Sequence, residues 1–396
     1  MSGLHCALEF RVTKPCCCPA ATVLIDAHCR RANKMPPISF VDSPFCSKEE
    51  YTCWLELPEA KRDAALSSAT AVAAAKATHT QPGMDKAGGR ILGDGTSIPA
   101  LGLGLYYTPP GAATYDIVAE ALKQGYRYVA GSYACHMIVL LSRRGHTHRP
   151  HRRHLDTAQF YENEEDVGRA VRDSGIPRDQ IFITSKVWPG EDGEWLTDGT
   201  KAVLETVEKS VSLLGTHTDL YLLHTPFNPE QRLNYYLGLE AAHKKGLTTS
   251  IGVSNFGVAH LKELLASDRT SVLPAANEVE LHPFLRKDDI AKFCALRSIA
   301  IICYSPLARA LRLDNAVLAG IAKDHGVGPT QVLVRWSIQR GYVPLPKSVN
   351  PKRIQQNADV FGFELTPADM TALDALDERL FTEWEEWGKI DPTEVP

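Results

Sequence analysis

The sequence predicts an α/β protein built as a (β/α)8, or TIM, barrel. Short apolar runs alternate with amphipathic helical patterns, which favours parallel strands joined by helical crossovers. Seven strand-like runs, with an eighth expected within residues 126–156, match the number of units in such a barrel. The rival doubly wound sheet is disfavoured, because Gly102-Leu103-Gly104 lacks the third glycine of the dinucleotide-binding fingerprint.

The barrel is expected over residues 89–396, behind a low-order extension at residues 1–88. The extension holds seven of the ten cysteines and an alanine-rich stretch, but no sustained apolar period, so we expect a disordered leader. Its cysteines lack the paired spacing of a zinc module. No clean secretory signal begins the chain, so a cytoplasmic location is the default and organelle targeting the alternative.

Composition argues against two classes of partner. The formal net charge of −4 disfavours general nucleic-acid binding, which usually needs a concentrated positive patch. No uninterrupted apolar run approaches the roughly 18 residues that a membrane span requires. We therefore expect neither a nucleic acid nor a membrane as partner.

The elements of the barrel follow in order from residue 89. Residues 90–98 predict an N-terminal β-hairpin turned at Asp94-Gly95, since Asp-Gly favours a tight type I′ turn. The strand-like runs are residues 100–105, 181–186, 220–224, 250–255, 275–281, 299–304 and 342–346. The helical patterns are residues 112–124, 164–173, 199–214, 231–245, 258–266, 287–296, 315–324 and 351–358.

The second barrel strand is interrupted in the sequence. Gly125-Tyr126-Arg127 begins a strand that should continue at His154, but an insert at residues 128–153 intervenes. The insert is rich in arginine and histidine, and its histidine spacing can bind zinc or nickel. A solvated basic excursion is the favoured interpretation, and we expect no metal site. Because backbone groups of a central strand must stay paired, an insert that fails to loop out would displace the residues that follow.

Polar residues end successive predicted strands, where barrel enzymes carry their chemistry. Asp156, Lys186 and His224 each end an apolar run, and Tyr161 lies five residues after Asp156. Hydride reduction of a carbonyl leaves an alkoxide that needs a proton. A tyrosine can supply it if a lysine, held by an aspartate, lowers its pKa from about 10, while a neutral histidine orients the carbonyl. The four residues together predict carbonyl reduction with a hydride-carrying cofactor.

Five motifs resemble the aldo-keto reductase superfamily, in its order and spacing. They are Leu155-Asp156-Thr157-Ala158-Gln159-Phe160-Tyr161, Ile183-Thr184-Ser185-Lys186-Val187-Trp188, Gly252-Val253-Ser254-Asn255-Phe256, Tyr304-Ser305-Pro306-Leu307 and Pro346-Lys347-Ser348-Val349. The resemblance covers residues 89–396 and is broken only by the insert. It implies NADPH-dependent reduction of aldehydes or ketones, with Tyr161 as proton donor, Lys186 and Asp156 tuning it, and His224 orienting the carbonyl.

The resemblance also implies a site for NADPH or NADP+ made by ten residues. They are Ser254, Asn255, Glu278 and Tyr304 at the nicotinamide, Ser305 and Leu307 at the pyrophosphate, Lys347, Ser348 and Arg353 at the 2′-phosphate, and Asn357 at the adenine. Lys347 and Arg353 flank a helix start after the last strand, where such barrels bind phosphate. Glu278 departs from the glutamine usual in the family, and its charge is expected to favour the oxidised nicotinamide.

The substrate pocket is expected to be aromatic. Its wall would include Tyr106, Tyr107, Trp188, Phe227 and His224, with the C-terminal tail around Trp384 and Trp387. Such a wall suits a small-molecule aldehyde or hydrophobic ketone better than a charged sugar, and the family resemblance implies a monomer. Two other classes compete with an active reductase. One is a non-catalytic NADP(H)-binding or inactive protein, if the insert disrupts the second strand. The other is a lyase or isomerase barrel. This class is disfavoured because the sequence shows no metal-ligand set.

Overall fold

The computed structural model describes residues 89–124, 153–189, 197–384 and 390–396, all within one compact unit at residues 56–396. The predicted leader at residues 1–88 and residues 128–152 of the predicted insert lie outside the described residues, and so do their cysteines and histidines. No helix in the described ranges is long and apolar enough to cross a bilayer.

Eight parallel strands form the barrel, and each pairs with its neighbour in chain order. They are β3 (Gly102–Gly104), β4 (Arg153–Asp156), β5 (Ile181–Val187), β6 (Thr218–Leu223), β7 (Thr248–Ser254), β8 (Ala276–Glu280), β9 (Ala300–Tyr304) and β10 (Val343–Pro344). The Gly104 amide donates to the Pro346 carbonyl at 3.3 Å, which brings the first strand against the segment that follows the last. The predicted (β/α)8 barrel is confirmed.

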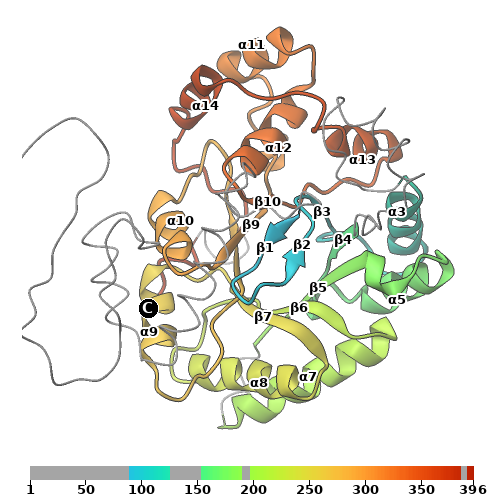
Figure 1. The fold of residues 1–396 in the computed structure, drawn as a ribbon, viewed down its shortest axis with the longest axis vertical. Coiled ribbons are helices and arrows are strands. Elements are labelled where there is room, and N and C mark those ends of the chain that lie inside the picture. The colour runs from blue at the N-terminus through green and yellow to red at the C-terminus, as the bar shows by residue number, and fades with distance from the viewer. Residues whose placement is uncertain (1–88, 125–152, 190–196, 385–389) are drawn as a thin grey trace, which may run out of the picture. The chain divides into compact units, whose positions relative to one another are not determined.

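Helices lie around the outside of these strands (Figure 1). They are α3 (Ala112–Lys123), α5 (Glu164–Asp173), α7 (Gly199–Leu214), α8 (Arg232–Lys244), α9 (Val258–Ala266), α10 (Asp288–Ala295), α11 (Ala316–Asp324), α12 (Pro329–Gln339), α13 (Pro351–Ala358) and α14 (Pro367–Asp374). The short 3-10 helices are η1 (Gln159–Tyr161), η2 (Arg178–Gln180) and η3 (Ala308–Ala310).

Two of these helices, α12 and α14, were not predicted. Helix α12 buries five large apolar side chains and carries a narrow polar stripe of Gln331, Arg335 and Gln339, which we did not recognise in the sequence. Helix α14 has the opposite character, because Leu373 is its single buried residue. Strands β6 and β7 begin two residues earlier than predicted, at Thr218 and Thr248, because buried threonines replace apolar residues there.

An antiparallel hairpin of β1 (Arg90–Ile91) and β2 (Ser97–Ile98) precedes the barrel, as predicted, but its turn differs. A type I′ turn needs positive φ at both central residues, whereas Gly95 alone in this turn has one, at 86°. The Leu92 amide donates to the Thr96 carbonyl at 2.8 Å, and the Gly95 amide donates to the Leu92 carbonyl at 3.0 Å. A left-handed glycine in this place is typical of a bulged hairpin.

The hairpin packs against the inside of the barrel. Leu92 and Ile98 are fully buried in one cluster with Phe182, Leu220 and Ala275, among other residues of the strands. The Gly93 amide donates to the Ala275 carbonyl at 3.1 Å, just before β8 begins. Since Ala275 precedes its strand, the hairpin covers the N-terminal end of the barrel and leaves the C-terminal strand ends for the site.

Strand β4 is paired on both sides despite the insert before it. It begins at Arg153, the last residue of the predicted insert, and pairs over its full length with β5, from Arg153 opposite Ile181 to Asp156 opposite Thr184. Residues 154–156 pair with β3. The described strand therefore holds Asp156 in register with both neighbours, and the break in pairing considered from the sequence does not reach it.

The contact between β3 and β4 depends on a glycine. A Cβ added to Gly102 would lie 2.4 Å from His154 Nδ1 and 2.5 Å from Leu345 Cδ2. The His154 ring is fully buried and its Nε2 is 2.9 Å from Thr184 Oγ1, so the ring has little room to yield. Only glycine at residue 102 lets the imidazole sit against the β3 backbone.

We expect Gly102→Ala to destabilise the barrel by about 1–3 kcal/mol, the usual cost of overpacking a close-packed interior. Urea unfolding followed by circular dichroism measures the change. Gly320→Ala in exposed helix α11 is the matched control, because its Cβ would meet nothing within 4 Å and alanine favours helix. Equal unfolding midpoints for Gly102→Ala and the wild type would contradict the packing argument.

Candidate active site

The parallel strands bring the four predicted catalytic residues to one end of the barrel. Asp156 is the last residue of β4, Lys186 lies one residue before the end of β5, and His224 follows β6 directly. Tyr161 ends η1, the short helix after β4, and Glu162 then turns the chain with a positive φ of 55°. The C-terminal ends of parallel strands lie at the same edge, so residues distant in sequence converge there.

Lys186 is the centre of the site and is fully buried. Its Nζ donates to Asp156 Oδ1 at 2.5 Å and to the Thr157 carbonyl at 3.1 Å, and it lies 3.3 Å from Glu278 Oε1. Three acceptors match the three N–H donors of an ammonium group. Burial lowers the pKa of Lys186, but its interactions with Asp156 and then Glu278 outweigh burial and hold the pKa above its ordinary value.

Tyr161 lies beside this ammonium. The distance from Lys186 Nζ to the centre of the Tyr161 ring is 5.3 Å. Burial raises the pKa of Tyr161, the Lys186 charge opposes that rise, and Asp156 adds to it. The net direction is upward, so the expectation of a lowered pKa was wrong: the lysine acts in the predicted direction but does not outweigh burial. Tyr161 therefore carries its proton at neutral pH, as a general acid must.

His224 is the neutral neighbour that the chemistry requires. The His224 ring makes a T-shaped contact with the Tyr161 ring, with ring centres 5.7 Å apart. It makes a second T-shaped contact with the Trp188 ring, at 5.2 Å. Burial, and then the positive charge of Lys186, hold the pKa of His224 well below its ordinary value. A neutral imidazole keeps one N–H donor, which can bond a carbonyl oxygen.

Aromatic side chains, several of them assigned to the substrate pocket from the sequence, lie beside Tyr161 and His224. Tyr106 contacts Tyr161 with ring centres 5.1 Å apart, and Trp188 stacks on Trp384 at 6.1 Å. Phe160, which we did not predict, stacks on Trp188 at 4.7 Å and is 46% exposed. Its position directly before Tyr161 was a signal that could have found it. The predicted Trp387 lies outside the described residues.

The residues assigned to the nicotinamide are joined in one hydrogen-bond network. Asn255, with a positive φ of 63°, donates to the His224 carbonyl at 3.0 Å and accepts from the Tyr304 hydroxyl at 2.8 Å. Ser254 Oγ donates to the Glu278 carbonyl at 2.9 Å. Trp384 Nε1 donates to the Tyr304 hydroxyl at 2.9 Å, which links this network to the aromatic wall.

The residues assigned to the phosphates lie around β9, β10 and α13. Ser305 Oγ donates to Glu383 Oε1 at 2.6 Å, and Arg309, which we did not predict, lies 3.3 Å from Glu383 Oε2. Leu307 precedes η3 and packs against the core beside β3 and β4. Ser348 and Asn357 are buried, whereas Lys347 and Arg353 are exposed.

The cations of this region fit an anionic group. Burial, and then the positive charge of Arg309, lower the pKa of Lys347, so two like charges lie close enough to disfavour each other. Arg353 occupies the first turn of α13, whose N-cap Asn350 accepts from the amides of Lys352 and Arg353. A helix N-terminus flanked by cations is a natural phosphate site. These residues therefore suit the phosphates of a dinucleotide.

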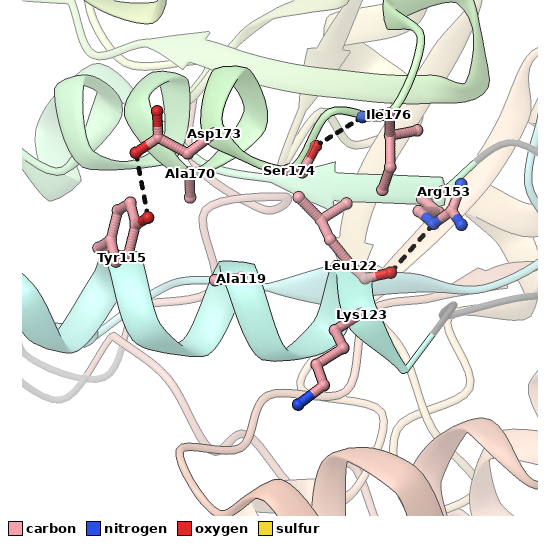
Figure 2. Close-up of a pocket in the computed structure, with 9 residues that line it drawn as sticks. All are labelled: Tyr115, Ala119, Leu122, Lys123, Arg153, Ala170, Asp173, Ser174 and Ile176. Carbon is pink, nitrogen blue, oxygen red and sulfur yellow. Dashed lines mark hydrogen bonds between the residues drawn. The ribbon is translucent and has the colours of Figure 1, made fainter.

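A cavity of about 330 Å³ lies between α3 and α5, away from these residues. Figure 2 shows Tyr115 donating to Asp173 across these helices, at 3.0 Å, and Arg153 donating to the Leu122 carbonyl, at 3.2 Å. Arg153 is at the opposite end of β4 from Asp156, and no predicted site residue lines this cavity. Among the described residues, no cluster of histidine, cysteine, aspartate and glutamate could hold a metal ion.

Comparisons with known proteins agree with this geometry. The sequence model of the Aldo/keto reductase family matches residues 115–378. An aldo-keto reductase of Mycolicibacterium smegmatis is 38% identical over 288 residues, 72% of this chain and 92% of that protein. A glyoxal reductase of Bacillus subtilis is 37% identical over 292 residues, 73% of this chain and 93% of that protein.

Solved structures extend the likeness to three dimensions. The crystal structure of an aldo/keto reductase from Brucella melitensis superposes with a TM-score of 0.62 at 34% sequence identity. The match covers 73% of this chain and 99% of that structure. By family model, sequence and fold alike, the chain belongs to the aldo/keto reductase family.

Proposed function

We propose that this protein reduces aldehydes and ketones to alcohols with NADPH as hydride donor. The observation that carries the proposal is the placement of Tyr161 beside the buried Lys186 and His224, where burial and the lysine hold the pKa of the histidine low. Family membership supports an oxidoreductase acting on carbonyl groups. Bound NADPH would supply the hydride that the side chains cannot provide.

Each of the four residues has a distinct task. Tyr161 donates its proton to the alkoxide oxygen that forms when the carbonyl is reduced, and Lys186 stabilises the tyrosinate left behind. Asp156 and the Thr157 carbonyl hold the lysine in place. His224 donates a hydrogen bond that orients the carbonyl. The intact pairing of β4 supports an active Asp156 over the non-catalytic alternative.

The remaining predicted residues would hold the nucleotide. Ser254, Asn255 and Tyr304 would bind the nicotinamide end, and Ser305 and Leu307 the pyrophosphate. Lys347, Ser348 and Arg353 would bind the 2′-phosphate that distinguishes NADPH from NADH, with Asn357 at the adenine. Arg309, close to Lys347, adds a cation to this group. A guanidinium suits the oxygens of a phosphate monoester.

The aromatic wall favours apolar and small carbonyl substrates. Tyr106, Trp188, Phe227 and Trp384 are joined by ring contacts beside Tyr161, and they present little charge to a bound molecule. Such a wall also excludes water, which strengthens the hydrogen bonds made to the carbonyl oxygen. The similarity to a glyoxal reductase supports aldehydes as a first substrate panel.

We expect Tyr161→Phe to lower kcat for aldehyde reduction by about 10²- to 10⁴-fold, because the substitution removes the proton donor and keeps the ring. NADPH consumption with the aldehyde panel measures the rate, and fluorescence titration checks that NADPH still binds. Tyr115→Phe is the control, since Tyr115 bonds Asp173 in a different part of the barrel. A Tyr161→Phe enzyme with wild-type kcat would refute the role.

We expect Arg353→Ala to weaken NADPH binding by about ten- to hundredfold, the worth of a charge-assisted hydrogen bond, and to leave NADH binding unchanged. Dissociation constants from fluorescence titration with both nucleotides test this. Lys352→Ala removes an exposed cation from the adjacent position of α13 and serves as control. Parallel losses for NADPH and NADH would show that Arg353 does not bind the 2′-phosphate.

A further inference from the structure

Glu278 contacts the catalytic lysine directly. It lies on β8 with its side chain 2% exposed, and its Oε1 is 3.3 Å from Lys186 Nζ. Register places Ser254 of β7 and Ile302 of β9 beside it, and neither carries a charge. From the sequence we expected the charge of Glu278 to act on the nicotinamide. The structure also places the glutamate against the Asp156–Lys186 pair, so that its charge would act on the lysine.

The charges of this group do not balance if both carboxyl groups are ionised. One ammonium would then face two carboxylates, and all three groups are almost completely buried. Like charges that share a buried site cannot both ionise at ordinary cost, so one carboxyl keeps its proton. One ammonium, one carboxylate and one protonated carboxyl together carry no net charge.

Two oxygens in the group lack a hydrogen-bond donor. Asp156 Oδ2 and Glu278 Oε2 are both buried without a hydrogen-bond partner among the described atoms. Buried polar atoms are almost always satisfied, and each exception calls for an explanation. A proton on one carboxyl supplies the missing donor, and the other carboxyl accepts it. The same hydrogen atom therefore resolves the excess charge and both unsatisfied oxygens.

The distances decide which carboxyl is protonated. Lys186 Nζ is 2.5 Å from Asp156 Oδ1 but 3.3 Å from Glu278 Oε1, so the ammonium stabilises the charged aspartate more strongly. Burial, and then the negative charge of Asp156, raise the pKa of Glu278 well above its ordinary value, while Lys186 opposes the rise. Burial also raises the pKa of Asp156, but the nearer ammonium of Lys186, and then a hydrogen bond with Glu278, oppose that rise. The same hydrogen bond raises the pKa of Glu278 further.

The other titratable groups that interact with Glu278 do not change this balance. They are Tyr161 in η1 and Cys303 on β9. Burial is the largest cause that raises the pKa of each above its ordinary value, so both are neutral near pH 7. Lys186 is then the one cation, and Asp156 the one anion, that faces Glu278 among the groups described.

We propose that Glu278 carries a proton at neutral pH and donates it as a hydrogen bond to Asp156. In this neutral form Glu278 positions the Asp156–Lys186 pair. The catalytic part of this inference rests on the proposed function, whereas the protonation does not. Protonated Glu278 is uncharged, like the glutamine usual at this position in the family. At neutral pH we therefore expect Glu278 to favour NADP+ over NADPH very little, in place of the clear preference expected for a charged glutamate.

The proton also sets the acidity of Tyr161. When the pair loses its proton, an added negative charge faces the ammonium that must stabilise the tyrosinate, and the charge of Glu278 raises the pKa of Tyr161. The acid is then weaker. The transition belongs to the Asp156–Glu278 pair and not to one carboxyl alone.

An infrared spectrum of the full-length protein tests the protonation without any assay of activity. At pH 7 the wild type should show the C=O stretch of a protonated, buried carboxyl, and Glu278→Gln should lose that absorption. Glu205→Gln removes an exposed carboxyl on α7 and should leave the spectrum unchanged in this region. The same absorption in Glu278→Gln as in the wild type would overturn the proposal.

Stability against pH gives a second, independent readout. A carboxyl whose pKa rises on folding stabilises the folded state below its unfolded pKa, near 4.3, and loses that contribution as pH rises through the folded value. Glutamine does not titrate. The wild type should therefore lose stability relative to Glu278→Gln as pH rises above about 4.5. The Tm of Glu278→Gln minus the Tm of the wild type should become more positive over this range. A constant difference across this range would overturn the proposal.

Kinetics then connects the proton to catalysis. The wild-type kcat should fall on the alkaline side as the pair loses its proton, and Glu278→Gln should lack that limb with KM little changed. The same alkaline limb in both proteins overturns the positioning role. If the infrared and stability experiments give the expected results while neither protein reduces an aldehyde, the proposed function is wrong. In that case the protonation of Glu278 is still supported.

Discussion

The Lys186 ammonium is a charge with no exposure to water, and most of the site is arranged around that constraint. A buried charge is tolerated only when its donors are satisfied and an opposite charge is near. Asp156, the Thr157 carbonyl and Glu278 supply this environment from three different segments. Burial, and then the same positive charge, hold the pKa of His224 low, and the charge opposes the effect of burial on Tyr161. Burial and one cation thus act together on the protonation states of the neighbouring residues.

The barrel makes this arrangement possible because parallel strands end together. Asp156 and Lys186 lie on adjacent strands, and Glu278 lies across the barrel on β8. Their side chains meet inside because the strands close into a ring with the hairpin covering the other end. The four residues of β4 suffice to fix Asp156, since each is paired to β5 and three are also paired to β3. A site at strand ends depends on the register at those ends.

The sequence was most informative where a residue type is demanded by both chemistry and position. Asp156, Lys186, His224 and Tyr161 were found because polar residues end apolar strands. It was least informative where tertiary contacts decide. Helix α12 has only a narrow polar stripe to mark it, and Arg309 becomes relevant only through its interactions with Lys347 and Glu383.

The direction of the Tyr161 pKa could not be read from sequence for a similar reason. The presence of a lysine indicated a lowering, but the net direction depends on how deeply the phenol is buried and on Asp156 and Glu278 beyond the lysine. Burial is a property of the folded barrel. The contact between Glu278 and Lys186 could not be predicted from the sequence either, because the distance between these side chains is set by the pairing of β8 in the folded barrel.

The segment Thr382–Trp384 joins the cofactor residues to the substrate wall. Glu383 accepts from Ser305, while Trp384 donates to Tyr304 and stacks on Trp188. Tyr304 in turn donates to Asn255, whose side chain bonds the His224 carbonyl. A chain of direct contacts therefore runs from Ser305, for which we propose a role at the pyrophosphate, to His224, which we propose to orient the carbonyl. Each of these residues contacts the next directly, so a change at one of them alters the surroundings of its neighbour. Differences in the C-terminal segment should thus affect nucleotide binding and substrate choice together.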